Sequence, residues 1–118
     1  MALFLIGLLP GFIPGRAAAG ELVWPLKYRI DLSNGFGEFR EGRFHAGLDL
    51  RTGGRTGRRV VSPVDGYVWR VKMAYDGYGK GLYVKGDDGY VYVLAHLSRF
   101  VPAIERPVKL AQLAARRY

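Results

Sequence analysis

Glycine places the strongest constraint on this fold, because seventeen glycines separate short runs rich in valine and aromatic residues. Such runs are typical of brief β-strands joined by tight turns. Residues 82–85 and 90–96 predict a hairpin that turns at residues 86–89. A further strand is predicted over residues 66–73, where alternation puts four side chains on one half-buried face: Tyr67, Trp69, Val71 and Met73. The sequence therefore predicts a mainly β fold built from antiparallel strands.

The composition changes after Pro102. Apolar residues then recur at helical spacing with arginine and lysine between them, as in Ile104, Val108, Ala111 and Ala115. This pattern predicts a C-terminal helix over residues 107–118, with Pro107 in its first turn. We expect the helix to pack on the domain rather than to lie on a membrane, because its apolar face is modest.

Residues 1–19 resemble a signal peptide for secretion. An apolar run over residues 2–9 precedes the small residues 17–19, which fit a cleavage site. No basic residue precedes the run, and Pro10 and Pro14 interrupt it, so a misplaced start or a short membrane anchor are the alternatives. The run is shorter than the roughly 20 residues that cross a bilayer. We therefore predict a secreted protein of the bacterial cell envelope, in the periplasm or cell wall, with membrane contact only through an uncleaved leader.

The formal net charge of +8 favours acidic partners, and the absence of cysteine excludes disulfides and thiolate metal sites. Four arginines gather in one glycine-rich loop: Arg51, Arg55, Arg58 and Arg59. This loop is either a solvated surface or a contact with an acidic wall polymer. Nucleic acid is disfavoured as a partner, because the loop has no aromatic residue on which bases could stack.

The chain has only two histidines, so a metal or acid-base site must include His45 or His96. Apolar residues alternate with His45 and Asp49 in this segment: Phe44, Ala46, Leu48 and Leu50. The alternation predicts that the histidine and the aspartate point away from the core. Four residues of straight strand would hold their α-carbons about 13 Å apart, so we expect Gly47 to bend the chain and let both side chains bind one metal ion. The alternative is a surface histidine near a turn aspartate.

His96 ends the predicted hairpin, on the same side of the strand as Tyr92 and Leu94. Three roles are open to it from the residues alone. It could pack at the strand end, act as a third metal ligand, or orient water and stabilise an oxyanion.

Four ordered segments resemble those of the lysostaphin and LytM-type peptidases. They are His45-Ala46-Gly47-Leu48-Asp49, Val60-Val61-Ser62-Pro63-Val64-Asp65-Gly66-Tyr67-Val68, Gly77-Tyr78-Gly79-Lys80-Gly81-Leu82-Tyr83-Val84 and Ala95-His96-Leu97-Ser98. The resemblance implies the family's small antiparallel β-sheet domain, the duplicated hybrid motif, over residues 20–118. It also implies a zinc endopeptidase that cleaves peptide cross-links of peptidoglycan. His45 and Asp49 would be two of the three ligands of one zinc ion, and His96 would be a catalytic residue rather than a ligand.

One part of the family pattern has no counterpart in this chain. A late His-x-His segment supplies the third ligand in the family, whereas this sequence has no histidine after His96. The turn aspartates Asp65, Asp76, Asp87 and Asp88 could in principle replace it. We expect instead a domain truncated before its closing strands, with residues 102–118 as a helical insertion, and a fragment that is inactive alone. The alternative is a non-catalytic, peptidase-like binding or regulatory module of the envelope.

Overall fold

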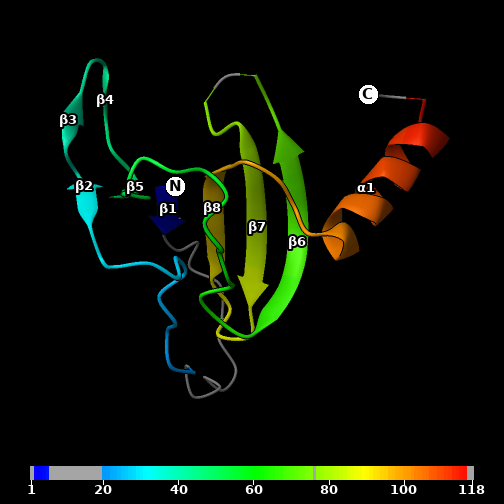
Figure 1. The fold of residues 1–118 in the computed structure, drawn as a ribbon, viewed down its shortest axis with the longest axis horizontal. Helices are drawn as coiled ribbons and strands as arrows, with labels where there is room; N and C mark the ends of the chain where they lie inside the picture. The colour runs from blue at the N-terminus through cyan, green and yellow to red at the C-terminus, as the bar shows by residue number, and fades with distance from the viewer. Residues whose placement is uncertain (1, 6–19, 76, 117–118) are drawn as a thin grey trace.

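The computed structural model describes residues 2–5, 20–75 and 77–116, and shows a sheet with a helix beyond it (Figure 1). Six strands form an antiparallel sheet in the order β2-β5-β1-β8-β7-β6, and two more form a separate hairpin. The strands are β1 (Ala2–Leu5), β2 (Leu32–Asn34), β3 (Phe39–Arg40), β4 (Arg43–Phe44), β5 (Gly47–Leu50), β6 (Gly66–Met73), β7 (Lys80–Gly86) and β8 (Val91–Leu97). One helix, α1 (Pro102–Ala114), follows them. The predicted mainly β class with a C-terminal helix is confirmed.

The predicted hairpin is present as β7 and β8. Lys85 pairs with Val91, and the Gly86 N–H donates to the Tyr90 carbonyl oxygen over 2.9 Å. The turn holds glycine where the backbone requires it, because Gly89 has a φ of 87°. These two strands lie in the middle of the sheet and carry most of the buried apolar side chains.

The core lies mainly on one face of this hairpin. Its buried members come from β7, β8 and the segment after β8: Leu82, Val84, Tyr92, Leu94 and Phe100. Alternation sends Val93 and Ala95 to the opposite face, where Tyr78 and Tyr83 pack on them. Apolar side chains therefore pack on both faces of the central strands.

The prediction of one shared face along β6 is wrong. A register shift lies between Val68 and Arg70, so one extra residue of β6 stands against β7. This bulge reverses the alternation: Val71 pairs with Leu82 on the core face, whereas Trp69 contacts the Tyr83 ring edge to face at 6.4 Å. Except for the half-buried Val71, β6 is exposed rather than half-buried, because it forms an edge of the sheet.

The helix begins at Pro102, the first residue of the predicted helical insertion and five residues before the start that the apolar spacing predicted, and Pro107 lies inside it rather than in its first turn. Only Ile104 packs against the core, while Leu110 is 68% exposed. The helix projects beyond β6 (Figure 1). The expectation that it packs on the domain therefore holds for its first turn alone. None of the described helical residues forms a segment long and apolar enough to cross a membrane.

Most of the predicted signal peptide lies outside the described residues. The part that is described, β1, pairs antiparallel with β5 on one side and with β8 on the other. Removal of residues 1–19 stays a prediction. Its structural consequence is clear, because cleavage would take away the strand that joins the two parts of the sheet.

Candidate functional site

His45 and Asp49 converge, as the sequence predicted. The His45 Nε2 atom lies 3.3 Å from Asp49 Oδ1. Zinc bonds of about 2.0–2.2 Å at a tetrahedral angle place two ligand atoms roughly 3.3–3.5 Å apart. The pair therefore has the separation that two ligands of one metal ion require.

The bend that joins the pair differs from the predicted one. Residues 45 and 46 form an irregular break between β4 and β5, whereas Gly47 is the first residue of β5. At this break Phe44 is exposed and His45 is only 5% exposed, so the predicted alternation is wrong here. The physical reason is backbone pairing: His45 donates to the Glu38 carbonyl and accepts from the Gly37 N–H, which turns its side chain inward.

Both candidate ligands are held by neighbouring groups. The His45 Nδ1 atom lies 2.8 Å from the Gly35 carbonyl oxygen, which favours the tautomer with its proton on Nδ1. That tautomer directs the Nε2 lone pair toward Asp49. Arg40, at the end of β3, donates to the other carboxylate oxygen of Asp49. Such outer partners are typical of metal-binding histidine and carboxylate side chains.

His96 lies apart from this pair. It stands at the end of β8 with an exposed side chain, and its N–H donates to the Tyr78 carbonyl oxygen over 2.9 Å. Its φ of 57° is unusual for a residue other than glycine. Across the part of the chain that the structure describes, no three metal-binding side chains lie together, so His96 does not join His45 and Asp49.

The turn aspartates also stay separate from the pair. Asp88 accepts the Tyr90 N–H and the Tyr92 hydroxyl, at 3.0 Å and 2.6 Å. Burial of Tyr92, together with this hydrogen bond to the Asp88 carboxylate, raises the pKa of Tyr92 to about 12. Asp88 therefore fixes the β7–β8 turn. Asp76 lies outside the described residues.

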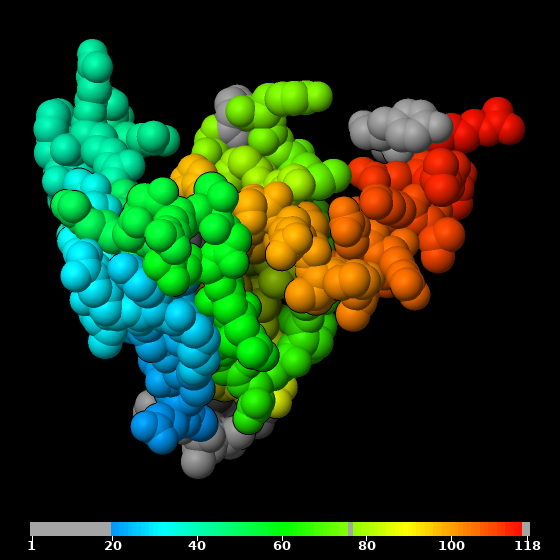
Figure 2. Space-filling view, in the orientation of Figure 1, coloured from blue at the N-terminus to red at the C-terminus, as the bar shows by residue number. Residues whose placement is uncertain are grey.

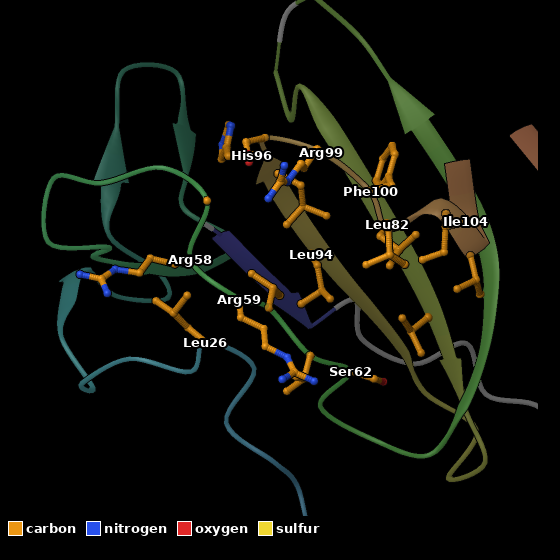
Figure 3. A pocket seen from close by; sticks show the side chains of 18 of the residues that line it. Leu26, Arg58, Arg59, Ser62, Leu82, Leu94, His96, Arg99, Phe100 and Ile104 are labelled. Carbon is orange, nitrogen blue, oxygen red and sulfur yellow. The ribbon is translucent and has the colours of Figure 1, made fainter. Parts of the chain in front are cut away.

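His96 lines a groove of about 760 Å³ on the core face of the sheet (Figure 3). The floor is apolar and includes Leu82 and Leu94. Residues 55–62 form one wall, and residues 97–105 form the other; the molecule is hollowed between these two segments (Figure 2). The first wall is anchored by antiparallel contacts, because the Lys27 N–H donates to the Arg59 carbonyl and Leu26 bridges Val60.

The four loop arginines differ in what they contact. The Arg51 Nε atom lies 3.6 Å from an Asp31 oxygen, and Arg58 lies 4.1 Å above the Tyr28 ring. Arg55 and Arg59 line the groove, and neither forms an ion pair with the described residues. The four arginines therefore do not form one surface, because Arg51 and Arg58 contact other residues of the domain.

Arg99 was missed by the sequence analysis. It follows His96-Leu97-Ser98 and lines the groove beside His96, at the end away from Ser62 (Figure 3). Its position next to a candidate catalytic segment was the only signal that could have identified it.

The antiparallel strands form a small β domain in which His45 and Asp49 lie side by side. The sequence profile described as Peptidase family M23 matches residues 43–115, a span that includes both residues and His96. The chain therefore belongs to peptidase family M23, and the resemblance to lysostaphin and LytM-type peptidases is confirmed over this part of the chain. No curated protein and no solved structure matched the chain. Membership supports a peptidoglycan-hydrolase-like function, in a family of generally zinc-dependent metallopeptidases.

Proposed function

We propose that this chain forms part of a zinc-dependent endopeptidase that hydrolyses peptide cross-links of bacterial peptidoglycan. The observation that carries the proposal is the 3.3 Å separation of His45 Nε2 and Asp49 Oδ1 within the segment that matches the family. These two residues would hold one zinc ion. Bound there, zinc would supply Lewis acidity for the hydrolysis of a peptide bond.

The chain's own residues position this site. Gly35 fixes the His45 tautomer through its carbonyl oxygen, and Arg40 holds the Asp49 carboxylate. The exposed imidazole of His96 would hold a water molecule or the carbonyl oxygen of a peptide in the groove, and would transfer a proton there. This role follows from its place on the groove and from the family resemblance.

A catalytic zinc site ordinarily has three protein ligands and one open position. The described residues supply two, so we propose that the third comes from a residue outside them and that this chain is inactive alone. A site with two described ligands also fits one other candidate function, that of a non-catalytic binding or regulatory module. In both cases we propose secretion to the cell envelope, where peptidoglycan lies, with the loop arginines available to acidic wall polymer.

Zinc binding tests the proposal directly. The chain, and a version extended with the downstream coding sequence, are purified and titrated with zinc by calorimetry, and peptidoglycan cleavage is measured for each. Asp49→Asn and His45→Gln are expected to weaken zinc binding by more than the roughly 10–100-fold typical of losing an outer partner. His96→Gln is the matched control, and in the extended version it should abolish cleavage while zinc still binds.

Two results would contradict the proposal. If the Asp49→Asn and His45→Gln variants are folded by circular dichroism and bind zinc as tightly as the unmodified chain, these residues are not ligands. If the extended version holds no zinc and cleaves nothing, the non-catalytic module is the better description.

A further inference from the structure

The groove beside His96 is strongly cationic. Its lining includes four arginines but only one acidic side chain. The arginines are Arg55, Arg58, Arg59 and Arg99, and the acid is Glu105 on the α1 wall. Such an excess of one charge in a concave site raises the local concentration of ligands of opposite sign.

Three of these arginines are available to a ligand. Arg58 is already bound within the domain, because it stacks on Tyr28 and its Nε donates to the Thr52 carbonyl over 3.3 Å. Arg55, Arg59 and Arg99 are exposed and form no ion pair with any described residue. Arg51, in the same loop, does pair with an acid. The groove thus holds cationic groups that the fold itself does not neutralise.

The floor limits the kind of anion that fits. Above the buried residues of its floor, the groove exposes the apolar side chains of Tyr67, Val68 and Val101. A uniformly charged polymer such as a polyphosphate would leave this surface in contact with charged groups. A peptide matches it better, because aliphatic side chains can cover the floor while carboxylates reach the arginines.

The arginines are also separated along the groove. Arg99 lies at the end with His96, and Arg59 lies nearer Ser62 on the opposite wall (Figure 3). One extended ligand could meet both only if it carried carboxylates at separate positions. Arginine binds carboxylates through a planar fork of donors, so it recognises such groups with directional hydrogen bonds.

We infer that this groove binds acidic peptides, and that Arg59 and Arg99 determine specificity by binding two carboxylates of one extended peptide. This inference deepens the proposed function and rests on it, since it names the substrate class that the peptidase would accept next to His96. Amidated peptides of the same length would then be poor ligands.

Calorimetry with two synthetic peptides tests the inference. One is Ala-Glu-Ala-Glu-Ala, and the other is the same peptide with glutamine at both acidic positions. At about 50 mM salt the acidic peptide should bind at least about tenfold more tightly. The difference should shrink at about 500 mM salt, where exposed charges are screened over only a few ångströms.

Variants locate the effect. Arg59→Gln and Arg99→Gln should each reduce affinity for the acidic peptide by about three- to tenfold and leave affinity for the glutamine peptide unchanged. Arg70→Gln is the matched control, since Arg70 pairs with Tyr83 on the opposite face of the sheet. Its affinity should equal that of the unmodified chain.

Three results would overturn the inference: equal affinity for the two peptides, no effect of either groove variant, or tighter binding of a short polyphosphate than of the acidic peptide. The last would assign the groove to a polyanionic wall polymer. The peptide titrations are done with a chelator present, and the zinc titration is done separately without it. A failed zinc titration would therefore refute the proposed function without affecting the peptide comparison, and the reverse also holds.

Discussion

Replacing Tyr92 with phenylalanine tests how the β7–β8 hairpin is held. The Tyr92 ring is buried in the core cluster that forms the groove floor, and its hydroxyl donates to Asp88 Oδ2 over 2.6 Å. The variant Tyr92→Phe keeps the ring and removes only the hydroxyl. Because a hydrogen bond to a charged group contributes about 1.5–3 kcal/mol, we expect a loss of this size in the free energy of unfolding near neutral pH.

The same contact makes stability depend on alkaline pH. Burial and the Asp88 carboxylate raise the pKa of Tyr92 to about 12 in the folded protein, whereas an unfolded tyrosine titrates near about 10. The folded state therefore keeps the proton more tightly. The resulting stabilisation is complete below about pH 10, and is lost as the pH rises toward about 12. By about pH 11 the loss amounts to about 1.4 kcal/mol.

Urea unfolding followed by tryptophan fluorescence, from about pH 8 to about pH 11, measures this effect. The quantity of interest is the difference in unfolding free energy between the unmodified chain and Tyr92→Phe, because the other tyrosines cancel in it. This difference should fall by about 1.4 kcal/mol across the range. A difference that stays constant would refute the argument, since it would mean that Tyr92 titrates alike in the folded and unfolded chains.

Three further predictions concern the sheet and are all measured by urea unfolding. Gly66→Ala should lower the free energy of unfolding by about 2–5 kcal/mol, because a Cβ there would overlap the Lys85 carbonyl and φ is 155°. Gly54→Ala, also at positive φ but with open space around it, should lower it by only about 1–2 kcal/mol. Leu94→Ala should lower the free energy of unfolding by about 2–5 kcal/mol, since Leu94 is 2% exposed. Leu110→Ala, at an exposed position, should lower it by about 0.5 kcal/mol or less. A chain that starts after residue 19 should unfold at a lower urea concentration, because β5 and β8 lose β1, the strand that pairs with both. Equal midpoints would show that β1 adds no stability.

Local patterns were sufficient for the central hairpin. Residues 80–97 alternate and turn at glycine-containing positions, so neighbours in the sequence already specify the strands and the turn between them. Local patterns were not sufficient for β6. Its bulge at Trp69 arises from pairing with β7, and no periodicity within 66–73 records that the partner strand is one residue shorter.

The approach of His45 and Asp49 was predictable from the sequence, whereas the surroundings of the two residues were not. Spacing and family resemblance identified His45 and Asp49, and the observed separation agrees with that expectation. The burial of His45 and the partner of its Nδ1 atom were not predictable, because Gly35 and the Glu38 carbonyl come from an earlier loop. Backbone pairing across that loop sets the direction of the imidazole.

By itself, the sequence determined the strand class, the central hairpin and the family. It also predicted His45, Asp49 and His96 as the site residues, and this stays a prediction. These depend on side-chain chemistry and on short spacings. Only the tertiary structure decided which charges remain without a partner in the fold. In the fold, Arg51 pairs with an acid and Arg58 stacks on an aromatic ring. Arg99 lies on the same groove as Arg59. The physical reason is that ion pairs and cavities depend on distances between segments far apart in the sequence, which the packing of the sheet fixes.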